Sequence, residues 1–148
     1  MPTIERTIRT DATPEAVWAY MSDFTTTNEW DPGTVRTVRR SGNGGVGTIY
    51  DNTSKFLGRE TQVVYTVAET NPPNRIQLRG ENTSVTATDT ITITPRGSGS
   101  TVHYRAELVF KGVLGRLDPL LSLPLVNRPF KQLGDGAQQG IEQALARL

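Results

Sequence analysis

Residues 84–110 read SVTATDTITITPRGSGSTVHYRAELVF, and they predict two strands joined by a glycine-rich turn. The first strand, residues 84–94, alternates threonine or serine with a second set on the opposite face: Val85, Ala87, Asp89, Ile91 and Ile93. The second strand, residues 101–110, places on one face Val102, Tyr104, Ala106, Leu108 and Phe110. This alternation is typical of antiparallel strands that are covered on one side and wet on the other. The stretch therefore predicts a sheet whose inner face needs a cover.

Further strands are predicted upstream by the same alternation and by turn signals between the runs. They occupy residues 3–10, 34–40, 46–56, 59–69 and 75–80. The inner face of the last two strands would carry Val63, Tyr65, Val67, Ile76 and Leu78. The pattern leaves open which face of residues 46–56 points inward. The complete set is a seven-stranded antiparallel sheet.

Two short helices are predicted between the first and second strands. Thr13 can cap the first helix, and Pro14 suits its first position. The second helix is one turn that ends at Asp31–Gly33. A long C-terminal helix is predicted from about Pro129, because apolar residues recur there at spacings of three and four. Before it lie the leucine-rich, proline-broken residues 114–128. They are interpreted as core, with a portal, a dimer surface or a segment that touches a membrane during lipid exchange as the alternatives.

Composition limits the classes of function. A length of 148 residues fits a single domain, 1–148. The net charge of +1, from 16 basic and 15 acidic side chains, argues against a nucleic-acid partner. There is no cysteine, and the single histidine, His103, is predicted on the outer face, so we expect no metal, no cofactor and no Ser-His-Asp triad. No run of about 20 apolar residues and no signal-peptide core is present, so we expect a cytoplasmic protein without stable membrane insertion.

Five short motifs occur in an order that is informative as a set: ATPEAVW at 12–18, WDP at 30–32, ETNPPNR at 69–75, TITITP at 90–95 and FKG at 110–112. With this order, the chain resembles the polyketide cyclase/dehydrase and lipid-transport family, within the START and Bet v 1-like (SRPBCC) superfamily. The resemblance implies an α+β helix-grip fold, in which a curved seven-stranded sheet wraps around a long C-terminal helix. It also implies an inner cavity for an apolar or aromatic small molecule. It implies no single reaction, because members include cyclases, lipid carriers and quinone-binding proteins.

Asp89 is the strongest single candidate for a functional residue, because it interrupts an apolar inner face. An unpaired buried carboxylate is costly, so Asp89 needs a partner, a solvated cavity or a raised pKa. It is a candidate polar anchor for a ligand and the one candidate general acid or base. Two structural alternatives remain open: an ion pair, for example with Arg6, or a bulge that turns Asp89 outward.

The predicted ligand-binding residues come from the inner faces of the strands and of the C-terminal helix. Tyr65 and Tyr104 offer a ring face and a hydroxyl, although ordinary core packing is the alternative. Gly136 and Gly140 either leave room for a ligand or allow close backbone packing. The full predicted set is Val63, Tyr65, Val67, Ile76, Leu78, Val85, Ala87, Asp89, Ile91, Tyr104, Ala106, Leu108, Leu133, Gly136, Ala137 and Gly140.

Three classes of function remain. We favour a binding protein, with transport or sequestration of a hydrophobic small molecule such as a lipid, quinone or polyketide-like compound. The first alternative is an enzyme of the cyclase/dehydratase type, which would move protons with polar groups of the cavity. The second is a partner-binding regulatory domain, for which we expect a collapsed cavity and an exposed apolar patch at residues 120–125. Both a monomer and a homodimer are compatible with the sequence.

Overall fold

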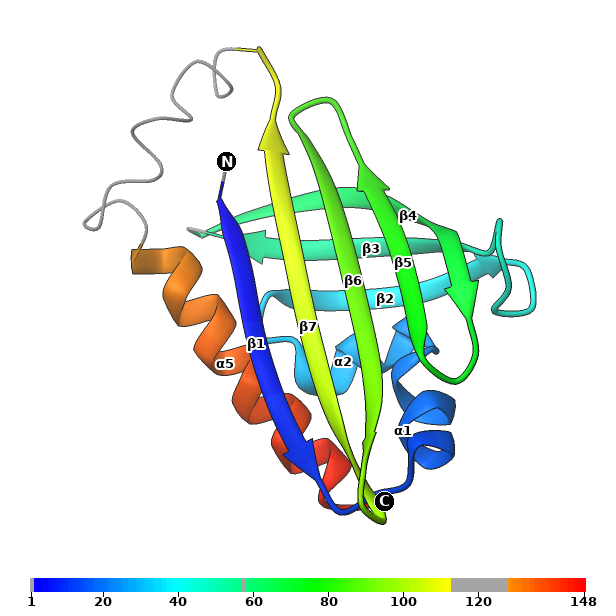
Figure 1. Ribbon diagram of the computed structural model, residues 1–148. Helices are drawn as coiled ribbons and strands as arrows, with labels where there is room; N and C mark the ends of the chain where they lie inside the picture. The colour runs from blue at the N-terminus through cyan, green and yellow to red at the C-terminus, as the bar shows by residue number, and fades with distance from the viewer. Residues whose placement is uncertain (1, 57, 113–127) are drawn as a thin grey trace.

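The computed structural model describes residues 2–56, 58–112 and 128–148, which form a curved sheet with helices on its inner side (Figure 1). This is the predicted α+β helix-grip fold. The elements, in chain order, are β1 (Thr3–Thr10), α1 (Pro14–Met21), η1 (Phe24–Thr26), α2 (Thr27–Trp30), β2 (Thr34–Ser41), β3 (Ile49–Phe56), β4 (Arg59–Asn71), β5 (Arg75–Glu81), β6 (Val85–Arg96), β7 (Gly99–Phe110) and α5 (Arg128–Leu145).

The seven strands form one antiparallel sheet in the order β1-β7-β6-β5-β4-β3-β2. Every neighbour pair except β1 and β7 is consecutive in the chain, so hairpin turns set most of the register. The decisive pair, β6 and β7, is in unbroken register from Val85 opposite Phe110 to Arg96 opposite Gly99. The alternation predicted for residues 84–110 is therefore realised along its full length.

Irregular register bends the other half of the sheet. The β4–β5 pairing shifts between Val67 and Glu69, and the β2–β3 pairing shifts twice. Such bulges kink a strand and increase its twist. As a result β2, β3 and β4 run across the direction of β6 and β7 (Figure 1). This curvature gives the sheet a concave face.

The open question of the β3 face is settled by burial. Tyr50 and Asn52 are buried, so they point inward. Asn52 donates a hydrogen bond to the Thr37 hydroxyl at 2.9 Å, and the Thr37 and Thr27 hydroxyls lie 2.7 Å apart. The hydropathy pattern was ambiguous because this part of the inner face is a hydrogen-bonded polar cluster and not an apolar row.

The first helix starts as predicted, because its cap chemistry is local. The Thr13 hydroxyl accepts a hydrogen bond from the backbone N–H of Ala16 at 3.2 Å, and Pro14 occupies the first turn. Helix α5 is held by tertiary contacts instead, against β1 and α2. The Arg6 guanidinium of β1 donates to the Asp135 carboxylate of α5 at 2.9 Å.

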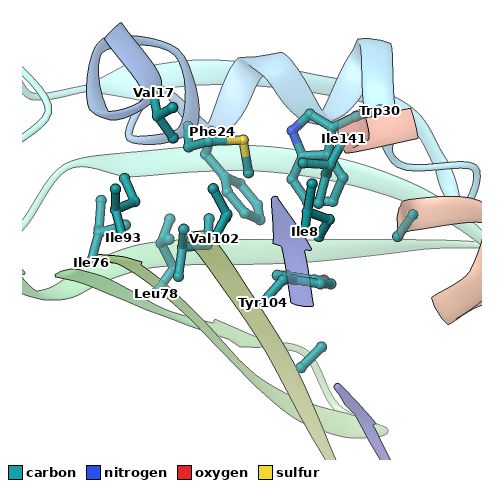
Figure 2. Packing of buried hydrophobic residues seen from close by; sticks show 14 of the residues in the cluster. Ile8, Val17, Phe24, Trp30, Ile76, Leu78, Ile93, Val102, Tyr104 and Ile141 are labelled. Atoms are coloured by element: carbon teal, nitrogen blue, oxygen red, sulfur yellow. The ribbon is translucent and has the colours of Figure 1, made fainter. Parts of the chain in front are cut away.

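The hydrophobic core lies between the concave face and the helices (Figure 2). Figure 2 shows two groups of buried side chains that face each other. On the helical side they include Val17, Phe24, Trp30 and Ile141, and on the strands they include Ile76, Leu78, Ile93 and Val102. The core fills the α1 end of the concave face.

Candidate functional site

A cavity of about 180 Å³ lies between the concave face of the sheet and helix α5. Strands β1, β3, β4, β6 and β7 contribute to its walls, and the turn after α2 contributes on one side. Within the described ranges, its lining residues are Ile4, Asp31, Gly33, Ser54, Lys55, Thr61, Val63, Tyr65, Val85, Ala87, Asp89, Tyr104, Ala106, Leu108, Phe110, Phe130, Leu133 and Ala137.

The hollow exists because small side chains occupy the inner face at one end of β6 and β7. Ala87 and Ala106 lie at this end, whereas Ile91 and Ile93 continue the same face of β6 into the core. Protein interiors are otherwise close-packed, so an unfilled space of this size can hold a small molecule or water. Aromatic rings from β7 and α5 border the space, with Phe110 and Phe130 centroids 6.3 Å apart.

Asp89 is buried, with 5% of its surface exposed, and it points into this space. Its Oδ2 accepts a hydrogen bond from the Tyr104 hydroxyl at 3.0 Å. Burial raises the pKa of Asp89 to about 7, although the Tyr104 hydrogen bond lowers it, and the charge of Asp31 raises it further. The Asp89 carboxyl group therefore titrates near neutral pH, where its acid and base forms are both populated.

Among the described residues, the structure contradicts an Arg6 partner for Asp89 and an outward bulge at this position. Arg6 is committed to Asp135 on α5 and does not pair with Asp89. No bulge turns the residue outward, because the β6–β7 register is continuous through the pair Asp89 and Ala106. The sequence could show that Asp89 points inward, but not that it is bound by Tyr104, which lies on β7 two residues before Ala106, the residue opposite Asp89.

Tyr104 is held on both sides. Its hydroxyl is bound to Asp89, and its ring packs edge-on against Trp30 with centroids 5.3 Å apart. Figure 2 shows the Tyr104 and Trp30 side chains approaching from the sheet and from the helical side. Burial, followed by the nearby charge of Asp89, raises the pKa of Tyr104 well above its usual value. Tyr104 therefore acts as a neutral donor that fixes Asp89.

Tyr65 owes its position to Gly80 on the next strand, which has no side chain. It pairs with Gly80 of β5, and a Cβ at Gly80 would lie 2.5 Å from the Tyr65 ring. The ring therefore lies across β5 and packs on Phe24, with centroids 4.8 Å apart. Among the described residues, the Tyr65 hydroxyl has no hydrogen-bond partner. Burial, and then the charges of Asp89 and Asp31, raise the pKa of Tyr65.

Asp31 is a cavity residue that the sequence did not single out as functional. Its carboxylate accepts hydrogen bonds from the Gly33 backbone at 3.0 Å and from the Thr34 hydroxyl at 2.8 Å. Burial raises the pKa of Asp31, although both hydrogen bonds lower it. The tripeptide Asp31–Gly33 has an ordinary turn signature. Tertiary contacts bring it to the cavity, including a hydrogen bond from the Lys55 backbone N–H to the Gly33 carbonyl at 2.8 Å.

The cavity includes most, but not all, of the residues predicted to bind ligand. It is lined by Val63, Tyr65, Val85, Ala87, Asp89, Tyr104, Ala106, Leu108, Leu133 and Ala137. Four others lie in the filled core instead: Val67, Ile76, Leu78 and Ile91. Alternation identifies the face of a strand, but it does not identify which end of that face is left empty.

Gly136 and Gly140 need a correction, because they do not line the cavity. A Cβ at Gly140 would lie 2.1 Å from the carbonyl oxygen of Trp30, and one at Gly136 would lie 2.8 Å from the Pro32 ring. The two glycines thus allow α5 to pack closely on α2. Helical spacing alone could not distinguish this contact from open space.

No group of three or more residues suited to hold a metal ion is present in the part of the chain that the structure describes. His103 lies on the outer face, as its strand parity predicted, and its Nε2 lies 2.8 Å from the Glu5 carboxylate. The helices of the described ranges are each too short or too polar to span a bilayer.

The fold and the cavity together place the protein in the class of α+β helix-grip domains that enclose a cavity between a curved sheet and a C-terminal helix. The sequence matches the family described as polyketide cyclase / dehydrase and lipid transport over residues 1–148, and the chain belongs to that family. No curated protein sequence matches it.

Several solved structures are similar in fold. The protein TTHA0849 from Thermus thermophilus superposes with a TM-score of 0.78 at 16% identity, covering 97% of each chain. The Zhui aromatase/cyclase from Streptomyces sp. R1128 gives 0.77 at 13% identity, covering 97% of this chain and 92% of its own. A START superfamily protein from Mycobacterium smegmatis gives 0.77 at 13% identity, covering 98% and 97%. At such identities the likeness shows the fold alone.

Proposed function

We propose that this protein reversibly binds a hydrophobic small molecule in the cavity between the sheet and α5. The observation that carries the proposal is an apolar space of about 180 Å³ with a polar group, the Tyr104–Asp89 pair, in its wall. Ligand pockets commonly combine such an apolar lining with a few placed polar groups. Membership in a family that includes lipid transport in its description supports the same interpretation.

The size of the space indicates how much ligand it holds. An engineered apolar cavity of about 150 Å³ binds benzene. The walls described here therefore suit about one or two rings of a lipid, quinone or polyketide-like compound. A ring system that buries about 200 Å² gains about 5 kcal/mol at roughly 25 cal/mol per Å², before the costs of association. Carriage or sequestration of such a ligand would follow from its release and rebinding.

A substitution that fills the cavity with a larger side chain tests whether the ligand binds there. Ala106→Leu adds three carbons to the cavity wall and should weaken naphthalene binding by at least about tenfold in calorimetric titration, because the ligand and the new side chain compete for one space. Val109→Thr is the matched control, since Val109 lies on the outer face of the same strand and is 44% exposed. Equal affinity in the wild type and Ala106→Leu would place the ligand elsewhere. Native mass spectrometry of protein purified from its own host would identify a natural ligand directly.

An enzyme of the cyclase/dehydratase type is the second candidate, and one observation favours it. Asp89 has a pKa of about 7, so both its acid and its base form are populated near neutral pH beside a bound molecule. The Zhui aromatase/cyclase shares the fold at 13% identity. If Asp89 transfers protons, Asp89→Asn should abolish turnover of a poly-ketone substrate while binding persists. Uptake without any product by the wild type would exclude this candidate.

A partner-binding regulatory domain receives less support. That class predicted a collapsed cavity, whereas the described walls leave an open space. The apolar patch that it predicted at residues 120–125 lies outside the described residues.

A further inference from the structure

We propose that the cavity selects an uncharged hydroxyl group carried on a hydrophobic ring, with the Tyr65 hydroxyl and the free carboxyl oxygen of Asp89 as its two contacts. This inference rests on the proposed binding function and adds the chemical class of the ligand. Two tyrosines, Tyr65 and Tyr104, line the same space.

The two tyrosine hydroxyls differ in how they are satisfied. Tyr104 donates to Asp89 at 3.0 Å, and its ring is locked against Trp30. Tyr65 has its ring fixed by Phe24 and by the gap at Gly80, yet its hydroxyl has no partner within the described ranges. Hydroxyl groups away from solvent are normally hydrogen-bonded, so an unpartnered one that lines a cavity is a candidate ligand contact.

Asp89 supplies the complementary acceptor. Only its Oδ2 is engaged by Tyr104, and the described part of the chain offers Oδ1 no donor. Tyr65 and Asp89 lie near each other, because Tyr65 pairs with Gly80, Gly80 pairs with Ala87, and Asp89 is the next inward residue after Ala87. A ligand hydroxyl can accept from Tyr65 and donate to Asp89 with one oxygen atom. When Asp89 is ionised, as it mostly is at about pH 8, a ketone could do only the first, and a hydrocarbon could do neither.

Charge at this end of the cavity disfavours an anionic ligand. Two carboxyl groups, Asp31 and Asp89, line it, and the pKa of each is raised by burial. A ligand carboxylate would bring a further negative charge into a poorly solvated site beside these two acidic groups. Lys55 is the one cation among the described lining residues, and its side chain is exposed. The groups that face the ligand are therefore donors and acceptors for a neutral hydroxyl.

Three probes on the same ring test this selection: 2-naphthol, 2-methylnaphthalene and 2-naphthoate. We expect calorimetric titration at about pH 8 to show 2-naphthol binding about tenfold more tightly than 2-methylnaphthalene, and 2-naphthoate binding most weakly. Tyr65→Phe should reduce the ratio of the 2-naphthol to the 2-methylnaphthalene affinity by about threefold, because the contact with Asp89 remains. Tyr20→Phe is the matched control, since the Tyr20 hydroxyl donates to Glu29 outside the cavity. That variant should keep the wild-type ratio.

Each other outcome overturns a defined part of the inference. Equal binding of 2-naphthol and 2-methylnaphthalene overturns the hydroxyl selection but leaves the proposed binding function standing. Tightest binding of 2-naphthoate overturns it in favour of Lys55 as the selecting group. Binding of none of the three probes overturns the binding function itself, and the selection with it. An unchanged affinity ratio in a folded Tyr65→Phe variant removes Tyr65 from the site.

Discussion

The two ends of the concave face have the same strand alternation but different contents. At the α1 end, Ile76, Ile93 and Val102 fill the space beneath the first helices. At the other end, Ala87 and Ala106 face α5 and leave a cavity. Apart from Asp89, the inward residues of β6, and of β7 from Val102 onward, are apolar or aromatic along both halves, so polarity alone does not separate core from site. The small side chains of Ala87 and Ala106 are what leave space at the hollow end. The polar groups Asp89 and Tyr104 lie near the boundary.

The largest effect that would test this division is the pH dependence caused by Asp89. Its pKa of about 7 in the folded state exceeds the ordinary value of 3.8, so the folded state holds the proton more tightly than the unfolded state. The stability that Asp89 contributes should therefore be fully present below about pH 4 and be lost as the pH rises to about 7, by an amount on the order of 4 kcal/mol at about 1.4 kcal/mol per pKa unit. Urea unfolding at about pH 5 and about pH 8 should show about 3 kcal/mol of this change, because the rest of the loss occurs below pH 5. Asp31 contributes in the same direction, because its pKa is also raised.

Asp89→Asn isolates the contribution of this one residue. It should remove most of the difference between the two pH values, because asparagine does not titrate. Asp11→Asn, a substitution at an exposed position outside the cavity, is the control and should keep the wild-type dependence. A wild-type slope in Asp89→Asn would mean that Asp89 is hydrated in solution, and the hollow end would then be wet.

Truncation at the two ends gives the next largest contrast. Ile93→Ala in the filled end should lower the free energy of unfolding by about 3 kcal/mol, because it creates a cavity in close-packed surroundings. Leu108→Ala in the hollow end should cost about 1 kcal/mol, since Leu108 already borders empty space and is only partly buried. Denaturant titration of both variants measures the difference. Equal losses would contradict the division of the face into core and cavity.

The smallest contrast compares the same change at two tyrosines. Tyr104→Phe removes the one donor to Asp89 in the described structure and should cost about 1–2 kcal/mol at about pH 8. Tyr65→Phe removes a hydroxyl without a described partner and should change stability by less than about 0.5 kcal/mol. Thermal unfolding of the two variants side by side is sufficient. A large loss in Tyr65→Phe would show that its hydroxyl is bonded within the protein.

Much of the architecture could be predicted because its causes are local. The strand faces follow from period-two alternation, and the start of α1 follows from the Thr13 cap and Pro14. The same alternation places Tyr65, Asp89 and Tyr104 on the cavity side. It failed for β3, where buried Asn52 belongs to a polar cluster whose partners come from β2 and α2. When a polar residue is buried because a residue distant in the chain hydrogen-bonds it, the hydropathy pattern does not show that it points inward.

Periodicity is sufficient to specify antiparallel strands, the inner face of most of them and the helical cover, because backbone geometry repeats every two or 3.6 residues. The packing of one element on another decides the rest. It packs Gly136 and Gly140 against the α2 region and brings Asp31 to the cavity. It also pairs Arg6 with Asp135 and not with Asp89. Among the described residues, it leaves the Tyr65 hydroxyl without a hydrogen-bond partner. These outcomes depend on contacts between residues that are distant in the chain, and no local period encodes such distances.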